Sequence, residues 1–191
     1  MPAGVAPKRF LAYLPTLAHL YLNPKIHKNP VSFRPIISQS QSYSKPLSRH
    51  ISDILTPFLG SFSPAHLRDS VHLKNLLLEQ ADASLPFISL DVTSLFTNVP
   101  IEPLLEFLHR KHIEGNMPLP AGYDIDGLLK LIRLCVKSTF FTFNGKFYKQ
   151  KQGVAMGNPL APVVAGLYME FYESELRYTL PGPQPSFWVR V

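Results

Sequence analysis

The chain of 191 residues has one cysteine, few charged residues and no long apolar run. The single cysteine, Cys135, excludes an intrachain disulfide and a cysteine-based zinc site, and it fits a reducing compartment. We therefore expect a nuclear or cytoplasmic location. No stretch reaches the roughly 18 consecutive apolar residues of a membrane span, so we expect no membrane partner. The sequence also lacks internal repeats and low-complexity tracts.

What the sequence does contain is enough apolar surface for a packed core. Hydrophobic residues make up 46% of the chain and aromatic residues 12%, which excludes wholesale disorder. The 19 Lys and Arg exceed the 13 Asp and Glu and give a net charge of +6. The 19 prolines are roughly twice the usual share of about 5%. They predict short elements joined by many corners.

Apolar residues at helical spacing predict several helices with charged outer faces. In the last of them, which we expect to begin at Pro159 and to run for about four turns, three glutamates fall on or near the polar side: Glu170, Glu173 and Glu175. The other predicted helices cover 47–58, ending at Gly60, and 70–80, 102–112 and 125–136.

Extended structure is predicted at four places. The basic, proline-punctuated stretch 21–35 suits extended segments joined by turns, and 186–191 suits the start of a strand. Within 139–150, Asn144-Gly145 separates two aromatic runs, and this pair tolerates the positive φ of a type I′ hairpin turn. Alternation of apolar and polar residues predicts a further strand over 86–92.

Asp91 places a carboxylate in this otherwise apolar strand. An ionised aspartate is unfavourable to bury without a cation or hydrogen-bond donors. Asp91 therefore either ends the strand at a wet cleft or binds a positive group. The alternative is a local turn or helix cap beside Thr93 and Ser94, since short polar side chains favour such bonding.

Four blocks in a fixed order carry a family resemblance. Phe87-Ile-Ser-Leu-Asp91-Val-Thr-Ser-Leu-Phe96 resembles the first palm motif of reverse transcriptases, and most closely that of Penelope-like retroelements. Pro24-Lys25-Ile26-His27-Lys28 followed by Arg34-Pro35-Ile36 looks like the fingers signature of the same family, and Arg68-Asp69-Ser70 fits its next stretch. Gln152-Gly153-Val-Ala-Met-Gly157-Asn158-Pro159-Leu160-Ala-Pro162 is similar to the second palm motif.

This resemblance implies an α+β fold, the fingers and palm of a right-hand polymerase, truncated before the palm Tyr-x-Asp-Asp hairpin. It implies an N-terminal segment over 1–19, a fingers-like region over 20–85 and a partial palm over 86–191. The implied function is that of a fragment of a retroelement RNA-directed DNA polymerase. The full-length parent would carry out template-directed nucleotidyl transfer from dNTPs by a two-metal mechanism.

The first palm motif implies the catalytic and metal-binding residues. Asp91 would be the catalytic carboxylate and, with the backbone carbonyl of Val92, a ligand for Mg²⁺, with Mn²⁺ as an alternative ion. Phe96 stands where the family has its sugar gate, a ring under C2′ that selects dNTPs; ordinary core packing is the alternative. For Thr97 and Asn98 we expect local capping of the following turn.

The second palm motif and the fingers signature imply the remaining contacts. Gln152 and Gly153 would open a loop whose bare backbone approaches the incoming nucleotide and the template. Gly157-Asn158-Pro159 would lead into a helix N-terminus that favours phosphate, or would form a plain helix-entry turn.

Three cations of the fingers signature would bind the triphosphate or the phosphates of an RNA template with its DNA primer. Lys25 and Lys28 would supply point charges, whereas Arg34 has the fork that suits two phosphate oxygens. We expect the affinity for an RNA–DNA hybrid to be mainly electrostatic. The alternative for these side chains is a solvated basic face.

The sequence departs from the family at one point. No Tyr-x-Asp-Asp occurs in it, and Tyr123-Asp124-Ile125-Asp126, which precedes the second palm motif, better suits a helix N-terminus. We therefore expect a truncated copy or partial gene model that does not polymerise alone. Two alternatives stay open: a non-catalytic nucleic-acid-binding remnant, and a basic α+β interaction domain with no nucleic-acid role.

Overall fold

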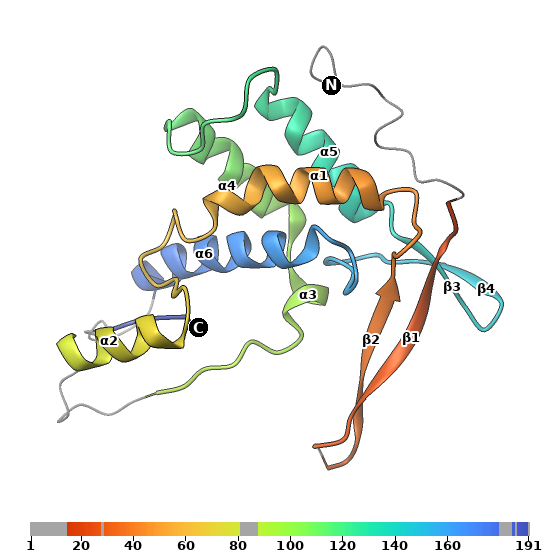
Figure 1. The fold of residues 1–191 in the computed structure, drawn as a ribbon, viewed down its shortest axis with the longest axis horizontal. Helices are drawn as coiled ribbons and strands as arrows, with labels where there is room; N and C mark the ends of the chain where they lie inside the picture. Colours follow the sequence, from red (N-terminus) through yellow and green to blue (C-terminus); the bar gives the residue numbers. More distant parts are fainter. Residues whose placement is uncertain (1–14, 28, 81–87, 180–184, 186, 191) are drawn as a thin grey trace.

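The computed structural model describes residues 15–27, 29–80, 88–179, 185 and 187–190. Within these ranges, helices form a body and a four-stranded sheet extends from one side of it (Figure 1). In chain order the elements are β1 (Ala18–Lys25), β2 (Ser32–Ser38), α1 (Lys45–Leu55), the 3-10 helix η2 (Thr56–Phe58), α2 (Ser70–Gln80), α3 (Leu95–Asn98), α4 (Ile101–Ile113), α5 (Ile125–Lys137), β3 (Phe140–Phe143), β4 (Lys146–Lys149) and α6 (Ala161–Thr179).

The body consists of α1, α4, α5 and α6 around a shared apolar core (Figure 1). Each helix presents an apolar residue every third or fourth position, so one stripe of its surface turns inward. The helices predicted over 47–58, 70–80, 102–112 and 125–136 are confirmed, and α6 is longer than predicted, with 19 residues. Fully buried side chains of this core include Ile51, Leu55, Leu104, Leu108, Leu128, Ile132, Leu160 and Leu167. None of the helices in the described ranges could cross a membrane.

Two local predictions are confirmed in detail. The Asp124 side chain caps α5 by accepting a hydrogen bond from the Gly127 backbone N–H at 2.7 Å, with Asp126 in the first turn. The segment around Tyr123 is therefore a helix start, as predicted. In the β3–β4 hairpin, Asn144 and Gly145 have φ values of 49° and 71°, as a type I′ turn requires.

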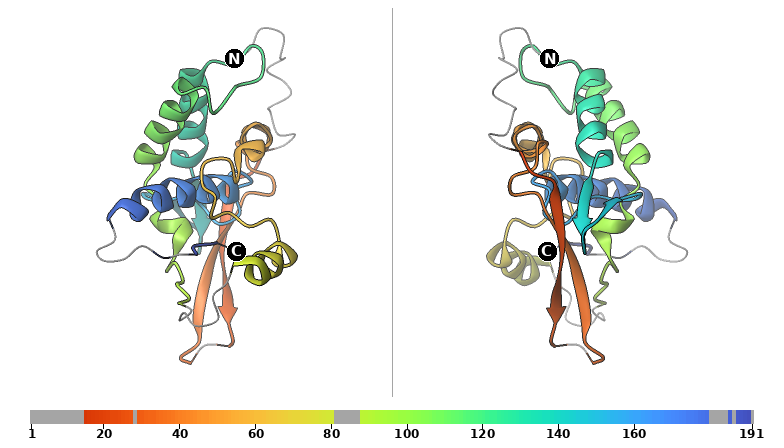
Figure 2. Two further views of the ribbon diagram at one scale, coloured as in Figure 1. Left: turned by 90° about the vertical axis from the view of Figure 1, so that its left-hand side faces the viewer. Right: turned by 90° about the vertical axis from the view of Figure 1, so that its right-hand side faces the viewer.

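The sheet has the strand order β2-β1-β3-β4. β1 pairs with β2 and β3 with β4 in antiparallel fashion, whereas β1 and β3 are parallel. The β1–β2 pair, which we call the arm, reaches well beyond the helices (Figure 2). A small second cluster of Ala18, Ile37 and Ala155 supports the base of the arm. The sheet thus joins strands from both sides of the predicted boundary at residues 85 and 86.

The strand predicted over 86–92 is wrong for residues 88–92, the part that the structure describes. These residues form no strand, and Ile88 and Leu90 are 82% and 73% exposed. A strand needs a neighbour to pair its backbone groups, and no described strand runs beside this segment. A strand start is also predicted over 186–191. Within the described residues 187–190, the structure has one isolated β-bridge, between Arg190 and His66.

The polar side predicted for α6 is wrong for two of its three glutamates. Glu170 is fully buried, and its two carboxylate oxygens accept hydrogen bonds from the backbone N–H groups of Gly60 at 2.7 Å and Phe62 at 2.9 Å. Glu173 is also buried and accepts from Arg190 Nε at 2.7 Å and Ser63 Oγ at 3.2 Å. Both carboxylates bind donors of the loop after α1, and Glu173 also binds Arg190, because these donors satisfy the buried charges.

Candidate functional site

The loop between β4 and α6 is the junction of the molecule. Within the five residues 154–158, its backbone and one side chain contact three separate elements, which sets the relative positions of the arm, α3 and α5. The three hydrogen bonds run from Val154 N to Phe96 O (2.7 Å), from Ile37 N to Met156 O (2.8 Å) and from Asn158 Nδ2 to Cys135 O (3.3 Å).

Gly153 brings this loop against the first palm motif. It has a φ of +66°, and a Cβ at this position would lie closer than 3.0 Å to the backbone of both Phe96 and Thr97. Only glycine allows so close an approach in this conformation. The structure thus places Gly153, and Gln152 next to it in the chain, beside the backbone of Phe96. The bare backbone of Gly153 is used here for a protein contact.

Phe96 lies in the short helix α3, which local hydrogen bonds hold. Its ring is half-buried and packs against the edge of the main core. Ser94 precedes the helix with a left-handed φ of 54°, and its carbonyl accepts from Thr97 Oγ1 at 3.0 Å and Asn98 Nδ2 at 3.2 Å. Thr97 and Asn98 thus form local hydrogen bonds, but to the preceding carbonyls of Thr93 and Ser94; the predicted capping of the following turn is not formed. The alternative of ordinary core packing therefore applies to part of the Phe96 side chain.

Asp91 is exposed in the extended segment before α3. Its carboxylate has no hydrogen bond or ion pair with another described residue, and the turn cap considered for it is not formed. In the described part of the chain, no three side chains of His, Cys, Asp or Glu cluster as a metal site would require. Asp91 therefore offers a single free carboxylate and one adjacent backbone carbonyl, that of Val92.

The basic residues of the fingers signature lie on the arm. Arg34 is exposed on β2 opposite Asn23 of β1, and Lys25, at the end of β1, pairs in register with Ser32. Arg34 forms no ion pair or hydrogen bond among the residues described, so its guanidinium is available to an external anion. Lys28 lies outside the described residues.

Asn158 is a structural residue that the sequence interpretation did not single out by itself. It is 3% exposed; its Nδ2 donates to Cys135 O, and its Oδ1 accepts from Leu160 N at 2.9 Å. Asn158 therefore satisfies one α5 carbonyl and one donor at the start of α6. The helix-entry turn considered for Gly157-Asn158-Pro159 describes this geometry. An asparagine just before a predicted helix start is the sequence signal that could have indicated it, because asparagine favours helix N-termini.

The strongest described cluster of charges lies away from this junction, between α4 and α5. Arg133 Nη2 lies 2.7 Å from a Glu102 carboxylate oxygen, and Lys137 Nζ contacts the other oxygen. Hydrogen bonds from Arg133 and then Lys137 lower the pKa of Glu102 to about 2. The same pairing raises the pKa of Arg133. All three side chains are near half exposed, so the cluster is a surface network.

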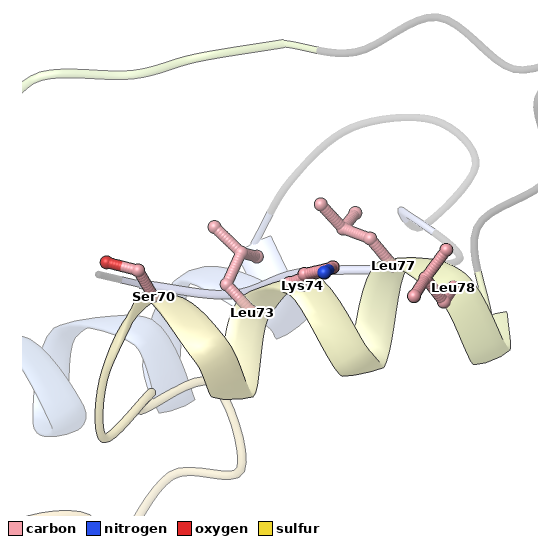
Figure 3. Close-up of a pocket in the computed structure, with 5 residues that line it drawn as sticks. All are labelled: Ser70, Leu73, Lys74, Leu77 and Leu78. Carbon is pink, nitrogen blue, oxygen red and sulfur yellow. The ribbon is translucent and has the colours of Figure 1, made fainter.

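Two hollows in the described part of the molecule lie away from the junction loop and its neighbours. One of about 370 Å³ runs along α2, where Leu73 and Leu77 point to the same side of the helix (Figure 3). The other, of about 250 Å³, lies between α4 and α5 beside Glu102 and His109. Neither is lined by a residue of the predicted site.

The family of the chain follows from its sequence match. Residues 26–182 match the family model described as reverse transcriptase (RNA-dependent DNA polymerase). The match includes Arg34, Asp91, Phe96 and the junction loop. The chain therefore belongs to the reverse transcriptase family. No curated protein gives a significant match to it.

Among solved structures, the chain is similar to an apo telomerase from Candida tropicalis that was truncated from its C-terminal domain. The TM-score is 0.54 at 14% sequence identity, and the similarity covers 95% of this chain. It spans 42% of the telomerase chain, so this chain is less than half as long as the structure it matches. The likeness confirms the predicted α+β fold and is consistent with a fingers and palm fragment.

Proposed function

We propose that the chain is the fingers (20–85) and partial palm (86–191) of an RNA-directed DNA polymerase from a Penelope-like retroelement. The full-length parent would copy an RNA template from a DNA primer with dNTPs. The observation that carries the proposal is the family match over 26–182, within which the junction loop joins Phe96 to the strand that bears Arg34. The segment 1–19 precedes the fingers, and the nuclear or cytoplasmic location stays a prediction.

In this proposal the nucleotide lies at the junction. Phe96 acts as the sugar gate, and Gln152 and Gly153 form the wall beside it. The contact of Gly153 with the Phe96 backbone supports this role, because it holds the ring and the loop next to each other. Arg34 binds phosphate oxygens with its planar fork, and Lys25 and Lys28 add charge along the arm.

The metal part of the proposal concerns the full-length parent. Asp91 and the carbonyl of Val92 are hard oxygen ligands of the kind that Mg²⁺ prefers, with Mn²⁺ as the alternative. The exposure of Asp91 and its lack of a partner among the described residues support this role. One carboxylate does not fit two ions that each require near-octahedral oxygen coordination. We therefore assign no metal-dependent step to this chain.

A primer-extension assay tests whether the chain alone polymerises. With an RNA template, a DNA primer, dNTPs and Mg²⁺ we expect no extension, because the chain has no Tyr-x-Asp-Asp. Asp91→Asn is the control variant. Extension by the wild-type chain that Asp91→Asn abolishes would overturn the proposed inactivity and confirm the role of Asp91.

A salt series of hybrid binding tests the arm. We expect the wild-type chain to bind an RNA–DNA hybrid with a steep negative dependence of log K on log salt concentration. Arg34→Gln should make this slope about one unit shallower, because one phosphate contact is lost. Arg49→Gln is the matched control, since Arg49 is also exposed but lies on α1. It should leave the slope unchanged.

A second candidate is a nucleic-acid-binding remnant without catalysis. The available guanidinium of Arg34, together with the missing Tyr-x-Asp-Asp, favours it. Hybrid binding without extension supports this candidate. The absence of binding even at low salt would contradict both nucleic-acid roles and leave a basic interaction domain.

A further inference from the structure

Gly157 makes an unusually close contact between the junction loop and the arm. Its φ is +114°, and a Cβ at this position would lie closer than 3.0 Å to the carbonyl oxygen of Ile37 and 3.1 Å from the Ile37 carbonyl carbon. The neighbouring hydrogen bond from Ile37 N to Met156 O, at 2.8 Å, holds the same two backbones together. Both obstructing atoms belong to backbone, so a side chain here has to displace β2 or the loop.

The contact lies at the base of the arm, where β1 also pairs with β3 through Ala18 and His19. Ile37 belongs to the small cluster with Ala18 and Ala155, whereas Phe33 and Ile26, further along the arm, are 55% and 82% exposed. The arm is therefore held mainly at one end. At about 3.4 Å per residue, Ser32 lies about 17 Å along β2 from Ile37, so a tilt of about 10° at the base moves the tip by about 3 Å.

We infer that Gly157 is a positioning residue that sets the angle of the arm relative to the body. Gly157 keeps Ile37 in backbone contact with the loop. It thereby fixes where Arg34, three residues earlier on β2, lies with respect to Phe96 of α3 and to Gly153, which is on the same loop as Gly157. The role of this angle in binding rests on the proposed function. The angle itself is a property of the chain and can be measured without any ligand.

Distance measurement between two spin labels tests the inference. Ile26→Cys places one label beyond β1 at the arm tip, and Ile113→Cys places the other at the end of α4; both positions are well exposed. The native Cys135 is buried, and burial raises the pKa of its thiol, so the labels react with the introduced cysteines. The chain without introduced cysteines is the labelling control.

In the labelled chain, Gly157→Ala should shift the mean distance by about 3 Å, the displacement expected from a tilt of about 10°, or broaden its distribution. Gly145→Ala is the matched control. Gly145 also has a positive φ, +71°, but a Cβ there has no neighbour within 4 Å. Gly145→Ala therefore introduces backbone strain at a positive φ but no close contact with a neighbouring backbone. The inference is overturned if folded Gly157→Ala keeps the wild-type distance distribution.

A second variant decides the question if Gly157→Ala loses its helical circular dichroism. Ala155→Val adds two methyl groups to the 2% exposed Ala155 of the arm cluster and keeps the backbone of Gly157. It should shift the distance by a smaller amount. An unchanged distance in this variant would equally overturn the inference.

Hybrid binding then separates this inference from the proposed function. If Gly157 acts through Arg34, Gly157→Ala makes the salt slope about one unit shallower. Arg34→Gln in the Gly157→Ala chain then adds no further loss, so the two effects are not additive. Additive losses would contradict the link to Arg34. If the wild-type chain binds no hybrid, the proposed function fails, while the distances still decide whether Gly157 sets the angle.

Discussion

The helical body and the segment before α3 contain similar apolar residues but bury them to very different extents. Leu104 and Leu108 of α4 are fully buried between helices, whereas Ile88 and Leu90 are 82% and 73% exposed. The helices satisfy their backbone hydrogen bonds internally and need only side-chain packing. The extended segment needs a second strand before its apolar side chains can be buried. The comparison shows that an apolar pattern is sufficient to bury side chains in the helices, whereas in the extended segment it is insufficient without a paired strand.

The arm stands between these two cases. Its two strands pair in register along seven residue pairs, from His19 with Ser38 to Lys25 with Ser32, and so provide hydrogen-bond partners for each other at alternate pairs. Its side chains nevertheless stay largely exposed beyond the base. The body is thus positioned by its core, whereas the arm is positioned at its base, by the short pairing of β1 with β3, the small apolar cluster and the backbone contacts of the junction loop.

The largest effect that we expect comes from truncating matched leucines in the two regions. Leu104→Ala should lower the free energy of unfolding by about 3 kcal/mol, because it leaves a cavity in a close-packed core. Leu90→Ala should change it by no more than about 0.5 kcal/mol. Urea unfolding followed by circular dichroism measures both. Equal losses would mean that the extended segment is packed in solution, and the comparison would break down.

An intermediate effect is expected where a buried charge joins the body to the loop after α1. In Glu170→Gln, the side-chain amide places a donor against one of the two backbone N–H groups that Glu170 accepts. One buried donor is left unsatisfied, which should lower the free energy of unfolding by about 2 kcal/mol.

Glu175→Gln is the matched control for this change in the same urea experiment. Glu175 lies on the same helix but is exposed, and its oxygen lies 3.6 Å from Arg110 Nη2. Its substitution should change the free energy of unfolding by no more than about 0.5 kcal/mol. If both variants lose the same amount, the buried carboxylate contributes nothing beyond a surface pair.

The smallest effect concerns the surface network on α4 and α5. The pKa of Glu102 is lowered from 4.5 to about 2 by Arg133 and Lys137, so its ionised form stabilises the folded chain. This contribution is complete above pH 4.5 and is lost as the pH falls through about 2. Solvent screens these exposed charges, so we expect less than about 1 kcal/mol.

Measurements of stability against pH check this contribution. Glu102→Gln should flatten the curve between pH 4.5 and 2 and lower stability at neutral pH. Glu106→Gln, one helical turn further along α4, is the control, because Glu106 has no charged partner among the described residues. A curve that is the same in wild type and Glu102→Gln would contradict the network's contribution.

The comparison also explains how much could be predicted from the sequence. The Asn144-Gly145 turn and the helix start at Tyr123-Asp124-Ile125-Asp126 depend on neighbouring residues only, and both are confirmed. The strand predicted over 86–92 depends on a partner strand elsewhere in the fold, and the prediction is wrong for the described residues 88–92.

The predicted site shows the same division between local and distant causes. The close approach of Gly153 to the backbone of Phe96 joins residues that are distant in the chain, and the roles predicted for both residues stay predictions. The burial of Glu170 could not be seen from its charge, although its spacing of three residues from Leu167 places both on one helix face. The contact of Gly157 with Ile37 joins residues far apart in the chain, and no local rule indicates it.

The parallel pairing of β1 with β3 has a consequence for how the chain matures. Ala18 pairs with Phe141 and His19 with Thr142, so the arm acquires its neighbour only after most of the chain has left the ribosome. Contacts of such high contact order form slowly, because the closure of a long loop precedes them. During synthesis, the backbone at the base of β1 lacks its neighbour until β3 has emerged, and this interval is when a chaperone would have most to protect.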